Sequence, residues 1–371
     1  MHPHSPGSNH SDRPVVAFSC GDLNGIGLPH LVQLFADNRL YQHCTPLCYA
    51  SGKVLGFYRK ALGLQDWTYQ NCPNPQQVQP RKFNLIQCWN EDVQLQPGEA
   101  NPALAQYATL SLRKATEDLL ASKVQALVTL PIDKNLMQSD QFRFAGHTEF
   151  LEAEVRRLIP SAREARSLMW LVSDRLRVAT LTGHLPLQEV AGQIGSERLE
   201  TKLLDMAASL ELDFAVRSPR IAVLGLNPHA GDGGLLGKEE QAVIAPTVLK
   251  LRGQGHWFFG PYGADGFWGS GAYKQFDAVL GMYHDQVLIP FKTLAFDQGV
   301  NFTAGLPVLR TSPDHGPAFD LAAKQAGNPS SLLHAVFEVL DRYKTRREQL
   351  DLRAHALQSV SKPSDLEHGE D

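Results

Sequence analysis

The sequence predicts an α/β protein built on a mostly parallel β-sheet. Short apolar runs rich in β-branched residues alternate with longer amphipathic stretches, which is the pattern of repeated strand–helix–strand units. The chain has 371 residues, of which 43% are hydrophobic, and this length favours two domains with a large core. No GxGxxG turn follows a predicted strand, so the usual dinucleotide-binding fingerprint is absent.

Eight apolar runs are expected to be strands because they are too short for helices. In chain order they cover residues 15–20, 46–51, 83–89, 125–130, 168–173, 177–183, 220–226 and 277–283. The fifth and sixth runs flank a short Ser-Asp-Arg turn, which predicts a β-hairpin inserted into the parallel pattern.

The longer stretches repeat apolar residues at intervals of three and four, as amphipathic helices do. They cover residues 103–123, 196–212, 238–254 and 330–350. We expect the last of these helices to end in a solvated basic face. The polar ends of the chain, 1–12 and 356–371, are expected to be disordered tails.

Composition argues against several classes of function. Lys and Arg number 35 against 39 Asp and Glu, so the net charge of −4 gives no electrostatic footprint for nucleic acid. No apolar run approaches the roughly 18–20 residues that span a bilayer. The five cysteines are odd in number and form no CxxC pair, which favours reduced thiols and a cytoplasmic location.

The stretch GLNPHAGDGG (225–234) places His229 directly after an apolar strand. Its glycines do not form a P-loop: Asp232 stands where GxxxxGK[ST] needs its first glycine, and Glu239 follows Lys238. In open α/β sheets, ligands bind at the carboxyl ends of strands. His229 therefore lies where a ligand is expected.

His184 and His284 also follow predicted strands. A single histidine in such a place is commonly a capping or core residue. Three of them favour a divalent-metal site with three imidazole ligands and one open position. Asp285 either orients His284 or is simply a turn residue.

The stretch GHTEFLEAEVRRLI (146–159) begins a helix. Thr148 and Glu149 either cap its N-terminus, or Thr148 binds an anion there together with His147 and backbone N–H groups. Both interpretations are compatible. Lys134, which follows the strand at 125–130, is either a solvated loop residue or part of a site.

Lys292, Asn301 and Arg310 are spaced through a stretch with few other charges. Arginine favours two-point pairing with a carboxylate or phosphate. A glycine turn at DHGPAFDLAAK (314–324) then opens a helix, which suits a pyrophosphate-bearing cofactor. The glycines of GDLNGIGLP (21–29) either need positive φ or let a ligand approach the backbone.

The ordered series of these motifs resembles a known family. The blocks are GDLNGIG, TLPIDK, GHTEFL, LTGHLPL, GLNPHAGDGG, GPYGADGFW, MYHDQVLIPFK and VNFTAGLPVLRTSPDHGPAFDLA. Together they resemble the 4-hydroxythreonine-4-phosphate dehydrogenase family of vitamin B6 biosynthesis, from about residue 15 to about residue 340. The blocks NPHAG, MYHDQ and RTSPDHG are specific in combination, whereas none suffices alone.

The resemblance implies a two-domain fold like that of isocitrate and isopropylmalate dehydrogenases, with a cleft between the domains. The first α/β domain would comprise residues 13–135 and 305–355, with a cofactor loop near 311–322. The second, 136–304, would carry the metal and dimer interface. The family is homodimeric with its active site at the subunit interface, and metal ligands are contributed across it.

Site residues follow by matched position. His184, His229 and His284 match the metal ligands. The matched substrate-binding residues are His147, Thr148, Lys292, Asn301 and Arg310. Asp265 matches an active-site acid and is the candidate proton acceptor. Lys292 is also assigned a catalytic role. The cofactor loop is matched by Asp314, His315, Gly316, Ala318 and Asp320.

The implied reaction needs NAD or NADP and a divalent ion, either Zn²⁺ or one of Mg²⁺, Mn²⁺ and Co²⁺. It oxidises 4-phosphohydroxy-L-threonine to 2-amino-3-oxo-4-(phosphooxy)butanoate, which decarboxylates to 3-amino-2-oxopropyl phosphate. The sequence departs from the family pattern at 21–30 and 287–300. Two alternatives therefore stay open: a relative acting on another phosphorylated four-carbon sugar acid or a dihydrodiol carboxylate, and an inactive metal- and NAD-binding protein.

Overall fold

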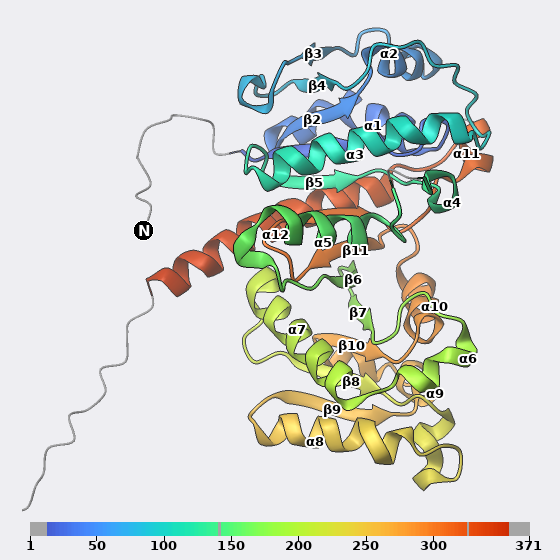
Figure 1. Ribbon diagram of the computed structural model, residues 1–371, viewed down its shortest axis with the longest axis vertical. Helices are drawn as coiled ribbons and strands as arrows, with labels where there is room; N and C mark the ends of the chain where they lie inside the picture. The colour runs from blue at the N-terminus through green and yellow to red at the C-terminus, as the bar shows by residue number, and fades with distance from the viewer. Residues whose placement is uncertain (1–12, 140–141, 325, 356–371) are drawn as a thin grey trace, which may run out of the picture.

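A computed structural model describes residues 13–139, 142–324 and 326–355, so the two predicted tails lie outside the described residues. Within this part of the chain, one twelve-stranded sheet runs the length of the molecule (Figure 1). The strand order is β3-β4-β2-β1-β5-β12-β11-β6-β7-β10-β8-β9.

All eight predicted strands are present. They are β1 (Val15–Ser19), β2 (Thr45–Ala50), β4 (Phe83–Gln87), β5 (Ala126–Thr129), β6 (Leu168–Ser173), β7 (Leu176–Thr180), β8 (Arg220–Leu224) and β10 (Ala278–Gly281). Four strands were not predicted: β3 (Tyr69–Asn71), β9 (Trp257–Tyr262), β11 (Val300–Ala304) and β12 (Arg310–Pro313). β1 illustrates why continuous apolar runs predict strands correctly here: a strand covered on both faces is apolar at nearly every position.

The sheet is mostly parallel, as predicted. The antiparallel pairs are β12–β11, β11–β6 and the predicted hairpin β6–β7, all at the centre of the sheet, and every other pair is parallel. β11 therefore runs against both of its neighbours. This antiparallel centre carries the site described below.

Helices connect the strands as the alternating pattern predicts. They are α1 (Gly27–Ala36), α2 (Gly52–Ala61), α3 (Ala105–Leu120), α4 (Lys134–Met137), α5 (His147–Leu158), α6 (Leu187–Val190), α7 (Ser196–Phe214), α8 (Ala245–Gly253), α9 (Ala264–Gly269), α10 (His284–Ala295), α11 (Phe319–Ala323) and α12 (Ser330–Ala354). In α3 the buried residues Ala108, Leu112, Ala115 and Leu119 fall on one face at helical spacing. The stretch predicted at 238–254 begins with a π-helical turn, Glu240–Ile244, and continues as α8.

The strands divide along the sheet according to the predicted domains. β3, β4, β2, β1, β5 and β12 come from 13–135 and 305–355, whereas β11, β6, β7, β10, β8 and β9 come from 136–304. The boundary falls between β12 and β11, which pair with each other. The division into two domains stays a prediction.

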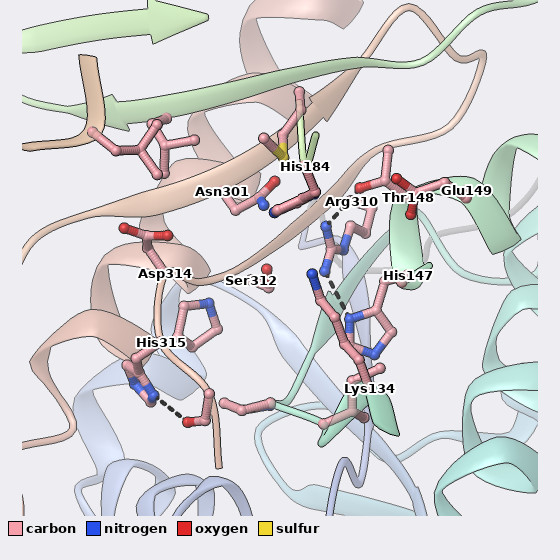
Figure 2. Close-up of a pocket in the computed structure, with 18 of the residues that line it drawn as sticks. Lys134, His147, Thr148, Glu149, His184, Asn301, Arg310, Ser312, Asp314 and His315 are labelled. Carbon is pink, nitrogen blue, oxygen red and sulfur yellow. Dashed lines mark hydrogen bonds between the residues drawn. The ribbon is translucent and has the colours of Figure 1, made fainter. Parts of the chain in front are cut away.

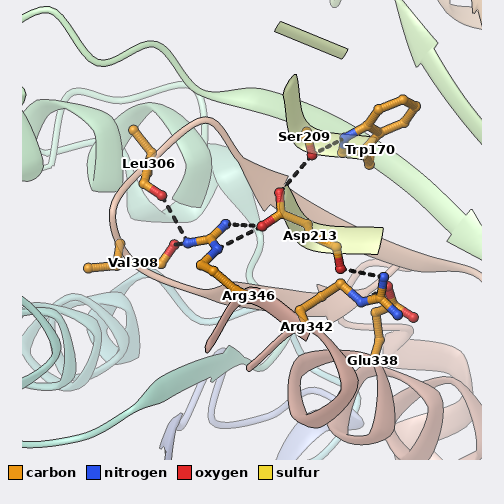
Figure 3. A network of polar contacts seen from close by, with 8 residues as sticks. All are labelled: Trp170, Ser209, Asp213, Leu306, Val308, Glu338, Arg342 and Arg346. Atoms are coloured by element: carbon orange, nitrogen blue, oxygen red, sulfur yellow. Dashed lines mark hydrogen bonds and ion pairs between the residues drawn. The ribbon is translucent and has the colours of Figure 1, made fainter. Parts of the chain in front are cut away.

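The expectation of a solvated basic face at the end of α12 was wrong at Arg346. This residue is only 8% exposed, and its guanidinium binds Asp213 of α7 at 2.6–2.7 Å (Figure 3). It also donates to the carbonyls of Leu306 and Val308, between β11 and β12. A basic residue in this helix is buried because a buried carboxylate on α7 pairs with it.

Two composition-based expectations can be compared with the structure. All five cysteines are buried and free, as expected for reduced thiols. No helix in the described ranges is both long enough and apolar enough to cross a membrane.

Candidate active site

A pocket of about 280 Å³ lies over the antiparallel centre of the sheet. Register explains which side chains reach it. Asn301 of β11 is paired with Ser312 of β12 and Leu171 of β6, and all three line the pocket. The next cross-strand row, two residues along, contributes Met169 and Arg310. These residues share a face because strand side chains alternate with a period of two.

Arg310 forms the buried floor of this pocket (Figure 2). Its guanidinium donates to the hydroxyl of Thr129 at 2.6 and 3.0 Å, to Thr303 at 3.2 Å and to Nδ1 of His147 at 3.0 Å. No carboxylate of the described residues is hydrogen-bonded to it. Burial lowers the pKa of Arg310 to about 9, so it remains a cation at neutral pH. The hydrogen-bonded partners of this buried cation are all neutral, and the carboxylate of Glu149 in the same pocket acts on it only electrostatically, so Arg310 can bind an anion.

His147 is held in one tautomer by Arg310. A guanidinium only donates, so Nδ1 must accept and the ring proton must lie on Nε2. Burial, together with Arg310 and Lys134, holds the pKa of His147 well below its usual range, which keeps the ring neutral. Nε2 is shielded from solvent and has no protein partner within the described ranges. His147 therefore offers an unused N–H group.

The start of α5 favours anion binding over capping by Thr148. The N-cap residue is Gly146, which makes no side-chain capping bond, and Thr148 is the second residue of the helix. Thr148 lies 3.4 Å from the hydroxyl of Thr303 and accepts a long bond from Arg310. The first N–H groups of α5 are thus free of a side-chain cap beside a buried cation, which is the setting in which helices bind phosphate.

Two lysines add positive charge to the same pocket. Nζ of Lys292 lies 3.3 Å from the carbonyl and 3.4 Å from the carboxylate of Asp314. Burial raises the pKa of that carboxyl group, and Lys292 opposes the rise. Lys134, which the sequence left undecided, lines the pocket, and its ammonium group makes no hydrogen bond or ion pair among the described residues. The pocket therefore suits an anionic ligand.

The predicted metal ligands are only partly assembled within one chain. The rings of His184 and His284 lie 5.5 Å apart at the pocket wall. Nδ1 of His284 is 2.6 Å from the carboxylate of Asp285, which leaves Nε2 for a ligand. His229 is exposed and does not line this pocket. Across the described ranges, no three His, Cys, Asp or Glu side chains gather as a metal cluster.

Asp265 also lies away from this pocket. It is exposed in the first turn of α9, next to the His229 loop: a Cβ on Gly263 would lie 3.5 Å from Cα of His229 and 3.6 Å from Oδ1 of Asp265. His229 and Asp265 thus form one group, and His184 and His284 form another.

The loop that carries His229 has an unusual backbone. His229, Ala230 and Asp232 have φ values of 54°, 52° and 44°, in the left-handed region. Each such residue costs about 1–3 kcal/mol and persists only where surrounding contacts fix it. Backbone strain of this kind concentrates at functional sites, and this loop holds a predicted ligand.

Gln286 ties together the ends of the strands that precede the predicted ligands. Its side-chain amide donates to the carbonyl of Gly225 after β8 and accepts from the N–H of Met282 after β10, both at 2.7 Å. The hydroxyl of Thr182, after β7, donates to Met282 at 2.6 Å. No role was predicted for Gln286 from the sequence. Its only signal was a polar residue two positions after His284, directly before the apolar run 287–291.

The predicted cofactor residues are divided. Asp314, His315 and Gly316 line the pocket, whereas Ala318 and Asp320 do not. Ala318 precedes α11 with φ 49°, and Asp320 lies in the first turn of that helix.

The loop at 21–29 packs behind this segment. The N–H of Ile26 donates to the carbonyl of Pro317 at 2.8 Å, and a Cβ on Gly25 would come 2.9 Å from Cβ of Pro317. At Gly25 the glycine is needed for a close approach between two segments of the protein.

Comparison with known proteins places this geometry in a family. The family model described as "Pyridoxal phosphate biosynthetic protein PdxA" matches residues 42–339. The chain belongs to the PdxA family. This confirms the resemblance seen in the sequence motifs.

Relatives within the PdxA family cover nearly the whole chain. A protein from Bacteroides thetaiotaomicron named 4-hydroxythreonine-4-phosphate dehydrogenase is 39% identical over 342 residues, which are 92% of each chain. A solved structure with the same enzyme name, from Klebsiella pneumoniae, is 30% identical with a TM-score of 0.74, covering 91% of this chain and 100% of that one.

A more distant structure shares the fold of the PdxA family. The terephthalate 1,2-cis-dihydrodiol dehydrogenase of Burkholderia xenovorans is 23% identical with a TM-score of 0.58, covering 89% of this chain and 98% of that one. At this identity the likeness concerns the fold alone.

Proposed function

We propose that this chain is a 4-hydroxythreonine-4-phosphate dehydrogenase of vitamin B6 biosynthesis. It oxidises the secondary alcohol of 4-phosphohydroxy-L-threonine with NAD or NADP, and the resulting 2-amino-3-oxo-4-(phosphooxy)butanoate loses CO₂ to give 3-amino-2-oxopropyl phosphate. The observation that carries the proposal is Arg310, a buried cation beside His147 and the uncapped start of α5, in a chain of the PdxA family.

The phosphate is assigned to this cationic corner. Arg310 supplies the charge, and Nε2 of His147, the hydroxyl of Thr148 and the first N–H groups of α5 supply neutral donors. Lys134 adds a second positive charge at the rim. Asn301, whose Oδ1 is buried without a protein partner among the described residues, and Lys292 orient the rest of the substrate.

The paired imidazoles fit a divalent ion. His184 is kept neutral because burial, Lys134 and His284 lower its pKa, and Asp285 orients His284. We assign both, together with His229, as the ligands. A bound ion would supply Lewis-acid chemistry toward the substrate's alcohol, and a bound nicotinamide would supply the hydride acceptor. Three imidazole ligands favour Zn²⁺ or Co²⁺, whereas Mg²⁺ and Mn²⁺, which prefer oxygen ligands, would depend more on oxygens of the substrate and water.

The separation of the two groups supports a homodimer with a shared site. His229 and Asp265 of one chain would complete the pocket formed by His184 and His284 of the other. Leu235 and Leu236, which follow the His229 loop, are 80% and 44% exposed, as expected for residues that a second copy covers. Asp265 would then accept the hydroxyl proton.

The cofactor is assigned to the segment 314–320 backed by the loop at 21–29. The pocket opens onto Asp314, His315 and Gly316, next to the substrate residues. We keep Ala318 and Asp320 as cofactor contacts further along this segment. A cytoplasmic location agrees with the five free, buried thiols.

The decisive experiment mixes metal-depleted protein with 4-phosphohydroxy-L-threonine and NAD⁺ or NADP⁺, then adds Zn²⁺ or Mg²⁺. Reduced nicotinamide is followed by absorbance. A metal-dependent rise is expected, and the unphosphorylated 4-hydroxy-L-threonine should be a much poorer substrate. No rise with either cofactor, although the cofactor binds by calorimetry, would exclude this substrate and favour one of the alternative substrates. Equal rates with and without the phosphate would remove the role assigned to Arg310.

A further inference from the structure

Glu240 is a buried acid beneath the His229 loop. It is 3% exposed and begins the π-helical turn before α8. Its Oε1 accepts hydrogen bonds from the backbone N–H groups of Leu226 and Asn227, at 2.7 and 2.8 Å. Its Oε2 accepts from the side-chain amide of Asn227 at 3.0 Å. One carboxylate therefore satisfies three donors just before His229.

The loop also wraps around this carboxylate on the other side of His229. A Cβ on Gly231 would lie 2.7 Å from Oε2, and one on Gly225 would lie 3.0 Å from Oε1. Both positions lack a side chain where the acid approaches the backbone. His229 lies between Asn227, which is hydrogen-bonded to Glu240, and Gly231, which packs on it. The left-handed turn is therefore fixed at both ends by one side chain.

We propose that Glu240 is the positioning residue of His229. Its carboxylate holds the strained turn in the conformation that presents the imidazole to a divalent ion. Glu240 itself touches neither substrate nor metal, and it acts through the backbone of residues 226–231. This inference rests on the proposed function, in which His229 is a metal ligand.

In this proposal the carboxylate of Glu240 must accept all three hydrogen bonds, and substitutions at residues 227, 239 and 240 test this. Glu240→Gln keeps the volume but sets an amide group against the amide of Asn227. The exchanged double variant is Asn227→Asp with Glu240→Gln, made in the Glu239→Gln background so that the new carboxylate does not face that of Glu239. It exchanges donor and acceptor, conserves the net charge of that background and restores the bond between residues 227 and 240. Glu239→Gln is the matched control, because Glu239 also accepts from Asn227, at 2.8 Å, but is partly exposed and bonds neither backbone N–H group.

The measurement is titration of the metal-depleted, full-length protein with Co²⁺, followed by its d–d absorption. Glu240→Gln should weaken Co²⁺ binding about 10- to 100-fold, the usual effect of losing a group that orients a ligand. The exchanged double variant should recover to within about threefold of the wild type, and Glu239→Gln should stay within that range. Circular dichroism reports whether each variant is folded.

Each outcome decides the matter. A folded Glu240→Gln variant with wild-type Co²⁺ affinity, or an equal loss in Glu239→Gln, overturns the role of Glu240. If Glu240→Gln does not fold, the double variant decides: recovery of the wild-type spectrum supports the proposal, and a folded double variant with lost affinity refutes it. His229→Ala is the reference. Unchanged Co²⁺ binding in His229→Ala would refute the proposed ligand set itself. If His229→Ala loses Co²⁺ binding but Glu240→Gln binds Co²⁺ as the wild type does, only the positioning role of Glu240 is refuted.

Discussion

At the scale of single residues, the site depends on charges that the fold has removed from water. Arg310 is a buried cation whose hydrogen-bonded partners are three hydroxyl groups and one imidazole. Its planar guanidinium reaches all of them at once because its donors are arranged in a fixed fork. All five N–H donors are engaged in these bonds, so an anion would be attracted by the charge of Arg310 and could replace its long bond to Thr148, at 3.5 Å.

Arg310→Lys should therefore lower kcat/KM for the phosphorylated substrate about 10- to 100-fold, corresponding to the loss of a charged hydrogen bond worth about 1.5–3 kcal/mol. An ammonium group keeps the charge but cannot bridge Thr129, Thr303 and His147. Steady-state kinetics on a variant shown to be folded measures the effect. Wild-type kcat/KM in Arg310→Lys would show that phosphate is bound elsewhere.

His30 gives a prediction for the pH dependence of stability. Burial, reinforced by His315, lowers the pKa of His30 to about 4, against about 6.5 in an unfolded chain. Between pH 4 and pH 6.5, His30 is therefore protonated in the unfolded chain but not in the folded protein. Stability must therefore fall as pH drops from 6.5 towards 4, by roughly 1 kcal/mol per pH unit.

His30→Gln should flatten this slope, whatever it does to stability at neutral pH. Urea unfolding at pH 7, 6, 5 and 4.5 compares the two proteins. His147, whose pKa is also lowered, contributes a slope of the same sign that remains in the variant. Identical slopes for the wild type and His30→Gln would contradict the assignment.

At the scale of elements, α12 is fastened to α7 by a buried network (Figure 3). Asp213 is 1% exposed and accepts from Arg346 and from Ser209, which in turn accepts from Trp170. Arg342 donates to the carbonyl of Asp213 at 2.8 Å. Because Arg346 also binds the segment between β11 and β12, the network joins both halves of the sheet.

Arg346→Met should destabilise the protein by about 3–5 kcal/mol, because it leaves a buried carboxylate without its cation. Adding Asp213→Asn should recover part of that loss, since the two changes remove one interaction. Urea unfolding measures both. Arg353→Ala is the control: its exposed contact with Glu211, at 3.8 Å, should be worth less than about 1 kcal/mol. Additive effects of the two buried changes would show that the pair is not coupled.

At the scale of the whole molecule, the proposed dimer makes a sharp prediction. If His184 of one chain and His229 of the other share a site, then His184→Ala and His229→Ala proteins are each inactive. Mixed dimers would contain one doubly altered site and one intact site. Random mixing should therefore restore about a quarter of the wild-type activity per site. The mixture is made by reversible unfolding or by co-expression with two affinity tags.

Complementation would place the ligands in different chains. An inactive mixture of proven mixed dimers would place all three histidines in one chain, or remove one of them from the site. The two single variants, each mixed with itself, control for spontaneous recovery.

The sequence by itself determined most of the elements and several of the residues that line the pocket. All eight predicted strands are present, because a run of apolar, β-branched residues reports local backbone preference and burial together. His147, His184, His284, Asn301 and Arg310 all line one pocket, as expected of polar residues at or near strand ends. These signals depend on residues that are close together in the chain, so they can be recognised in the sequence.

Only the tertiary structure decided which elements meet. β11 and β12, four or five residues long and rich in polar residues, were not predicted, yet their antiparallel pairing builds the pocket floor. No local sequence pattern predicts that Arg310 is buried against Thr129, or that Glu240 accepts hydrogen bonds from the His229 loop. The two groups of predicted ligands also separate only in three dimensions. Such contacts depend on residues distant in sequence, and whether a polar side chain is solvated or buried is settled only when those partners pack against it.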